Sequence, residues 1–101
     1  MSKEYQSFGA FYPFYLKEHS NTVNRRLHFV GSTLVLMIIL WSIWSHDLRW
    51  LLLTPLVGYG FAWVGHFVFE KNRPATFTYP LYSFMGDWVM WKDMLSGKIR
   101  F

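Results

Sequence analysis

Two histidines occupy matching positions in the two most apolar stretches of the chain. These stretches are roughly Leu27–Ser45 and Leu48–Phe69, and they meet at His46–Asp47. His28 lies 19 residues before Asp47, and His66 lies 19 residues after it. If the stretches are antiparallel helices joined by a tight turn, both imidazoles lie at one level, roughly 28 Å from the turn at a rise of 1.5 Å per residue. Histidine is costly in that position unless it is paired or functional, so the spacing predicts a chemical site there.

The other two histidines have different expected positions. His19 stands nine residues before His28, and on one straight helix the two rings would face opposite sides. However, Ser20 or Asn21 is expected to be the N-cap of the first long helix. His19 would then lie on the loop before that helix and could fold over the site. His46 is expected in the turn, at the far end of the hairpin, as a solvated residue beyond the reach of a shared metal.

Acidic and amide side chains gather at the same end of the hairpin. Asn24 lies four residues before His28, and Glu70 lies four residues after His66, so each shares a helix face with its histidine. Either residue could orient a metal-bound imidazole or could itself be a ligand. Glu70 could instead pair with a basic neighbour at an ordinary helix end. The candidate catalytic carboxylates, which would take up a substrate proton or complete a metal shell, are Glu18, Glu70 and Asp87.

Arginine side chains are expected at this interface as well. Arg25 and Arg73 could contact lipid phosphates, or they could bind a substrate carboxylate in bidentate fashion. The second use suits a fatty acid whose tail points into the bilayer while its head group meets the metal. The candidate substrate-binding residues are Arg25, Arg73, Asn24 and Asn72.

Length and hydropathy predict one all-α membrane domain over residues 1–101. The apolar fraction of 52% does not decide the class by itself, but between Leu27 and Phe69 the only charged residues are Asp47 and Arg49, at the proposed turn. Aromatic residues make up 22% of the chain and mark the edges of both runs. We expect two transmembrane helices, flanked by a short N-terminal helix or irregular lid (residues 8–18) and an amphipathic interfacial helix (residues 81–95). The alternative is a buried helical hairpin in a soluble oligomer.

The charge distribution predicts an orientation in the lipid bilayer. Nine of the ten basic residues flank the hairpin and one, Arg49, lies in its turn. By the positive-inside rule both termini should be cytoplasmic, in the inner membrane if the source is bacterial. The scattered net charge of +4 is not the footprint of a nucleic-acid-binding module. Because the chain has no cysteine, a metal would have to be bound by histidine or carboxylate.

Two longer strings match a known family. FYPFYLKEHSNTVNRRLHFVGS (Phe11–Ser32) and GHFVFEKNRPATFTYPLYSFMGDWVMW (Gly65–Trp91) contain the signatures E-H-x4-N-R-x2-H and H-x3-E-x-N-x-P-A. Through these strings the chain resembles the 2-hydroxy-fatty-acid dioxygenases, in particular their short bacterial members. The resemblance covers nearly the whole chain apart from its first residues and the middle of the hairpin.

The resemblance implies an iron(II)-dependent oxygenase that uses O2 to shorten 2-hydroxy fatty acids by one carbon, a step of fatty acid α-oxidation. The family's essential histidines fall on His19, His28 and His66, whereas His46 matches no motif position. An Fe(2+) ion held by three histidines would keep open positions for a 2-hydroxycarboxylate and for O2. Eukaryotic members are longer and have additional spans, so a homo-oligomer is a further expectation for this shorter chain.

Rival functions remain open at the level of the residues. Zinc would accept the same ligands as iron. Two histidines at one level on antiparallel membrane helices could also hold a b-type haem in an electron-carrier subunit. A non-enzymatic membrane scaffold, in which the histidines cap helix ends, would bind no stoichiometric metal.

Overall fold

The computed structural model describes residues 5–101, and the regular secondary structure of this part of the chain is all helical, with no β-strand. The α-helices are α1 (Phe8–Lys17), α2 (Thr22–Trp44), α3 (Leu53–Val64) and α4 (Pro80–Leu95). Shorter helical segments are η1 (Leu48–Leu52), η2 (Gly65–Glu70) and η3 (Ala75–Phe77). The predicted all-α class, with two helices long and apolar enough to span a membrane, is confirmed.

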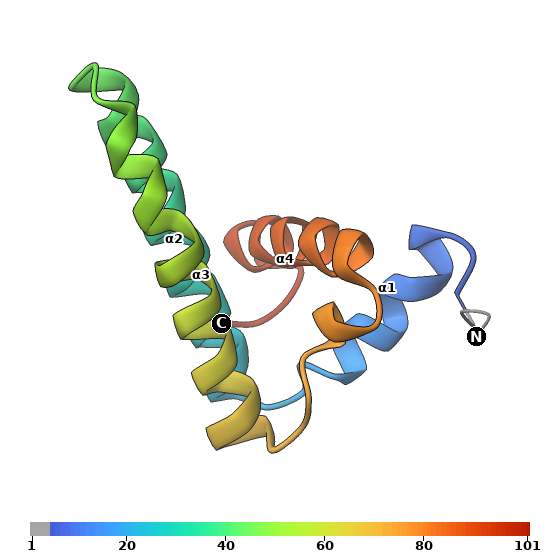
Figure 1. Ribbon diagram of the computed structural model, residues 1–101. Coiled ribbons are helices and arrows are strands. Elements are labelled where there is room, and N and C mark those ends of the chain that lie inside the picture. Colours follow the sequence, from blue (N-terminus) through green and yellow to red (C-terminus); the bar gives the residue numbers. More distant parts are fainter. Residues whose placement is uncertain (1–4) are drawn as a thin grey trace.

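Helix α2 and the run η1–α3–η2 form the predicted hairpin (Figure 1). Asn21 is the N-cap of α2, and its side chain accepts the backbone N–H groups of Val23 and Asn24 at 2.9 and 3.1 Å. At the other end the chain reverses through His46, which has a left-handed φ of 56°. The second run begins as a 3-10 turn, continues as α-helix and ends as a π-helix over Gly65–Glu70.

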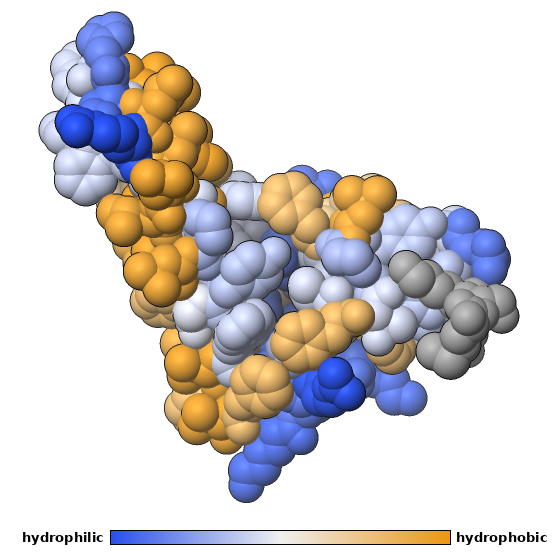
Figure 2. Space-filling view, in the orientation of Figure 1, coloured by the Kyte–Doolittle hydropathy of each residue, from blue (hydrophilic) through white to orange (hydrophobic). Residues whose placement is uncertain are grey.

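The hairpin exposes its apolar side chains instead of burying them. In the most apolar 18-residue windows of its two long helices, only 17% and 11% of the residues are buried. Hydrophobic residues cover its sides in Figure 2, while the tip at the turn is hydrophilic. Both helices are long and apolar enough to cross a membrane, and their exposed apolar surface fits contact with lipid or with a second copy of the chain.

A second, aromatic-rich unit packs α1 against α4. The segment 8–18, for which a helix or a lid was expected, is the helix α1 and includes Pro13. The Tyr12 hydroxyl donates to the Asp93 carboxylate on α4 at 2.8 Å. The buried apolar core lies here, outside the hairpin, and consists of Phe11, Tyr15, Ala75, Tyr79, Met90 and Met94.

Helix α4 also contacts the half of the hairpin that is remote from the turn (Figure 1). The Trp91 indole N–H donates to the Thr33 hydroxyl on α2 at 3.0 Å. Within the hairpin, α2 and α3 approach closely at Gly31, where a Cβ would come within 2.8 Å of the Phe61 Cβ. These contacts hold α1, α4 and the base of the hairpin around one shared space, in which the candidate site lies.

Candidate metal centre

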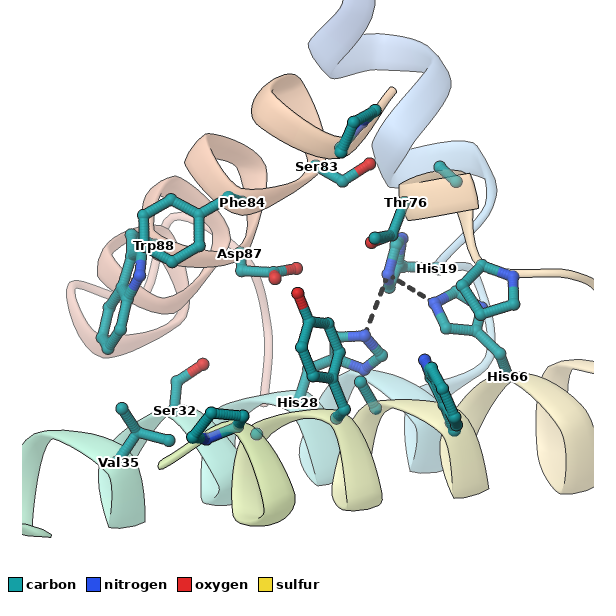
Figure 3. Close-up of a pocket in the computed structure, with 18 of the residues that line it drawn as sticks. His19, His28, Ser32, Val35, His66, Thr76, Ser83, Phe84, Asp87 and Trp88 are labelled. Atoms are coloured by element: carbon teal, nitrogen blue, oxygen red, sulfur yellow. Dashed lines mark hydrogen bonds between the residues drawn. The ribbon is translucent and has the colours of Figure 1, made fainter. Parts of the chain in front are cut away.

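Three histidines from three different segments converge in the interior. His19 lies on the loop after α1, His28 on α2 and His66 in the π-helical segment η2 (Figure 3). The His19 Nε2 atom is 3.2 Å from the His28 Nε2 and 3.0 Å from the His66 Nε2. Their potential ligand atoms all lie within 4.8 Å of one another, and the exposed fractions of the three residues are 1%, 6% and 2%. Three imidazoles at this spacing could hold a metal ion.

The other nitrogen of each ring fixes its orientation. The Nδ1 atoms of His19 and His28 lie 2.6 and 3.0 Å from the backbone carbonyl oxygens of Tyr15 and Asn24. The Nδ1 of His66 lies 2.7 Å from the Asn72 amide oxygen. Because all three partners are acceptors, each Nδ1 must carry the proton, and each Nε2 then presents a lone pair toward the same point. Three facing lone pairs repel one another unless a cation lies among them, so the site fits a metal ion.

The electrostatic surroundings of His19 keep its ring neutral. Burial, and then the two neighbouring imidazoles, hold the pKa of His19 well below its usual value of 6.5. A neutral imidazole can coordinate a metal, whereas a protonated one cannot. Three nitrogen ligands leave further coordination positions for substrate, and both iron(II) and zinc accept such a set.

Glu70 holds together the two hairpin elements that carry histidines. Its carboxylate accepts the Ser20 hydroxyl at 2.9 Å, the Asn21 backbone N–H at 2.8 Å and the Asn24 side-chain amide at 3.0 Å. Glu70 stands at the end of η2, so these bonds connect that segment to the start of α2. Close packing adds to the connection, because a Cβ at Gly65 would overlap the Asn24 side chain. Glu70 and Asn24 thus connect the segments that carry the histidines and do not line the cavity.

The other polar residues of the two motifs lie around the histidine-bearing loops. Asn72, besides accepting from His66, donates to the Glu18 backbone carbonyl at 3.1 Å. Arg25 donates to the carbonyl oxygens of His19 and Ser20 at 3.2 and 2.8 Å. The Arg73 guanidinium lies over the Phe77 ring, 5.5 Å from its centroid. The candidate residues that are absent from the lining of the cavity beside the histidines are Glu18, Glu70, Arg25, Arg73, Asn24 and Asn72.

That cavity has a volume of about 250 Å³ and lies between the hairpin and α4. The histidines form one part of its wall, and Asp87 on α4 is the predicted carboxylate that also lines it (Figure 3). Away from the histidines the wall becomes largely apolar, along the hairpin toward the turn. The lining residues of that part include Val35, Pro55, Tyr59, Phe84 and Trp88.

Asp87 and Tyr15 form a pair beside the three histidines. The Tyr15 hydroxyl donates to the Asp87 carboxylate, and the Tyr15 ring stacks on His19 with 4.0 Å between ring centroids. Burial raises the pKa of Asp87 from 3.8 to about 7, against the opposing effect of the Tyr15 hydrogen bond. Sequence reasoning missed Tyr15, although its place four residues before His19 could have indicated a shared helix face.

Comparison with family models finds a match that covers nearly the whole described part of the chain. The model of the family described as 2-hydroxy-palmitic acid dioxygenase Mpo1-like matches residues 5–99. The chain belongs to this family. No match is found among curated proteins or among solved structures. The Mpo1-like match includes all three convergent histidines, both helices of the hairpin and α4.

The Mpo1-like site leaves no room for the haem considered from the sequence. The His19 Nε2 is within 3.2 Å of the Nε2 atoms of both His28 and His66. A porphyrin plane between those two rings would have to pass through the position of His19. His46 lies at the hairpin turn, as expected from its place in the sequence.

Proposed function

We propose that this Mpo1-like chain is an iron(II)-dependent dioxygenase that removes C1 from 2-hydroxy fatty acids in an O2-dependent reaction. The observation that carries the proposal is the convergence of three neutral imidazole nitrogens at the polar part of a cavity that is otherwise apolar. His19, His28 and His66 would hold the iron(II), which when bound supplies the activation of O2 and an anchor for the 2-hydroxycarboxylate.

The cavity favours an amphiphilic substrate that is bound in one orientation. The head group would lie at the histidines, and the alkyl tail would follow the apolar wall formed by Val35, Pro55 and Phe84. A volume of about 250 Å³ is at the small end for a ligand site, where roughly 300–1,000 Å³ is usual. We therefore place only the first part of a long acyl chain inside the protein and the rest in the bilayer.

Asp87 is the carboxylate that we assign to proton transfer. It lines the cavity, and its pKa of about 7 suits a group that accepts the proton of the substrate's 2-hydroxyl near neutral pH. The Tyr15 hydroxyl would orient the carboxylate by its hydrogen bond. Glu18 and Glu70, the other two candidates, we assign to holding the loops around the histidines, through the Glu18 carbonyl and the Glu70 carboxylate.

Of the four candidate substrate-binding residues, three receive positioning roles in this proposal, and Arg73 receives a role at the lipid surface. Asn24 and Asn72 orient His28 and His66, while Arg25 holds the loop that carries His19. Arg73, stacked on Phe77, lies at the base of the hairpin, where it can contact lipid phosphate.

The hairpin would cross the bilayer with both chain termini on the cytoplasmic side. The exposed apolar residues of α4 outside the cavity, such as Leu81 and Leu95, would rest on the membrane surface.

Product analysis tests this function. The iron-loaded protein in lipid nanodiscs is given 2-hydroxypalmitate with and without O2, and fatty acids are measured by mass spectrometry. We expect O2-dependent formation of the 15-carbon acid by the wild type and by the turn variant His46→Ala, and none by His66→Ala. Failure of the iron-loaded wild type to consume the hydroxy acid in the presence of O2 would refute the proposal.

A further inference from the structure

Ser83 carries a buried hydroxyl that is left without a partner beside the cavity. The residue lies on α4, is 1% exposed and lines the cavity. Within residues 5–101, the Ser83 Oγ has no hydrogen-bond partner. The equally buried Ser42 differs, because its hydroxyl donates to the Asp47 carbonyl at 3.1 Å. An unpaired buried hydroxyl is destabilising, so its presence at this position calls for a reason outside the folding of the chain.

The direction of the hydroxyl supplies that reason. A serine in a helix commonly donates its hydroxyl to the carbonyl four residues earlier, but Ser83 donates its backbone N–H to the Tyr79 carbonyl, at 2.9 Å, and not its hydroxyl. Figure 3 shows the Ser83 side chain directed into the cavity, on the same side of α4 as Asp87 and across the cavity from His28. Ser83 and Asp87 are four residues apart and so lie on one face of α4.

Packing against α1 fixes the position of this face. At Gly86, between the two residues, a Cβ would come within 2.9 Å of the Tyr15 ring. The missing side chain lets α4 approach Tyr15 closely, and the Tyr15 hydroxyl then reaches Asp87. This packing fixes the part of α4 that carries Ser83 and Asp87 against Tyr15.

We infer that Ser83 is a substrate-binding residue whose hydroxyl donates a hydrogen bond to the carboxylate of the 2-hydroxy acid. The inference rests on the proposed function. A carboxylate is an acceptor-only group and so matches a free donor. Among the described residues that line the cavity there is no lysine or arginine, and Arg25 and Arg73 are engaged elsewhere. The head group therefore has to be recognised by neutral donors together with the metal.

Anaerobic binding measurements test the inference without turnover. The full chain is loaded with iron(II) in nanodiscs and titrated with 2-hydroxypalmitate, and binding is followed by tryptophan fluorescence, to which Trp63 and Trp88 in the cavity wall contribute. Loss of a hydrogen bond to a charged group predicts about 10- to 100-fold weaker binding by Ser83→Ala. The thermal stability of this variant should equal or exceed that of the wild type, because the removed hydroxyl has no partner to lose.

Two controls separate the role of the hydroxyl from a structural one. Ser42→Ala should bind 2-hydroxypalmitate like the wild type but unfold at a lower temperature, because its hydrogen bond to the turn is lost. Hexadecane-1,2-diol, which has no carboxylate, should bind the wild type and Ser83→Ala with equal affinity.

The outcomes distinguish this inference from the proposed function. Wild-type affinity for 2-hydroxypalmitate in Ser83→Ala would overturn the role of Ser83 and leave the proposed function standing. An equal loss of affinity for acid and diol, or a loss of stability together with affinity, would overturn it too. If the wild type does not bind the hydroxy acid at all, the proposed function and the inference both fail.

Discussion

At the residue scale, the acceptors behind the histidines should control metal affinity. Asn72 accepts the Nδ1 proton of His66 through its side chain, whereas His19 and His28 use backbone carbonyls that mutation cannot remove. We expect Asn72→Leu to weaken metal binding about 10- to 100-fold, because the His66 ring loses its orientation and basicity. Competition with a chelator for cobalt(II) or zinc measures the effect. Asn72→Asp keeps an acceptor and should bind more tightly than Asn72→Leu; the reverse order would contradict this role.

Asp87 should make stability depend on pH. Its pKa is raised by burial from 3.8 to about 7 in the folded chain, so the folded state binds more protons than the unfolded state between these pH values. The free energy of unfolding attributable to Asp87 is therefore greatest below about pH 4 and is lost as the pH rises through 7. Asp87→Asn keeps an acceptor for Tyr15 and removes this dependence. The free energy of unfolding of the metal-free protein is measured at pH 5 and at pH 8. It should fall less between these pH values in Asp87→Asn than in the wild type, and an equal fall in both proteins would contradict the assignment.

Some residues of the site can be predicted from the sequence, and others cannot. His28 and His66 could be placed together because equal spacing from a turn fixes their level on two helices. The place of His19 depended on the break at Asn21, which the structure shows as the N-cap of α2. Ser83 could not be found, because its significance lies in the absence of a partner, and partners are set by tertiary packing.

At the element scale, the approach of α4 to α1 depends on Gly86. A methyl group there would come within 2.9 Å of the Tyr15 ring, which stacks on His19 and bonds to Asp87. We expect Gly86→Ala to lower the free energy of unfolding by about 1–3 kcal/mol and to weaken metal binding. Gly9→Ala is the matched control, because its Cβ meets nothing within 4 Å. It should be neutral or stabilise α1 by up to about 1 kcal/mol. Equal effects of the two substitutions on unfolding would refute the role of Gly86.

The ends of the helices were more predictable than their buried faces. Asn21 and the turn at His46–Asp47 carry local signals, and the observed helices begin and end near them. In α4 the apolar stripe predicted over residues 81–95 is largely exposed, at Leu81, Phe84 and Leu95. The buried residues of that helix include the small or polar Ser83, Gly86 and Asp93. Hydropathy alone misses such a face, because close approach to α1 requires small side chains there and the polar part of the cavity requires polar ones.

At the scale of the whole molecule, the proposed topology places the turn and the C-terminal segment on opposite sides of the membrane. The chain has no cysteine, so single cysteines can be introduced as reporters. In intact cells, His46→Cys should react with a membrane-impermeant maleimide, and Lys98→Cys should react only after the membrane is opened. Labelling of both positions, or of Lys98→Cys alone, in intact cells would contradict the orientation predicted from the flanking basic residues.

The most direct test of the central claim is the metal content of the protein purified without oxygen. Mass spectrometry of the wild type, His66→Ala and the matched turn variant His46→Ala compares a residue of the convergent cluster with one at the far end of the hairpin. We predict about one non-haem iron per chain in the wild type and in His46→Ala, and loss of the iron in His66→Ala with the fold retained. Absence of metal from all three proteins, or iron present only as haem with its Soret absorption, would contradict a three-histidine iron centre.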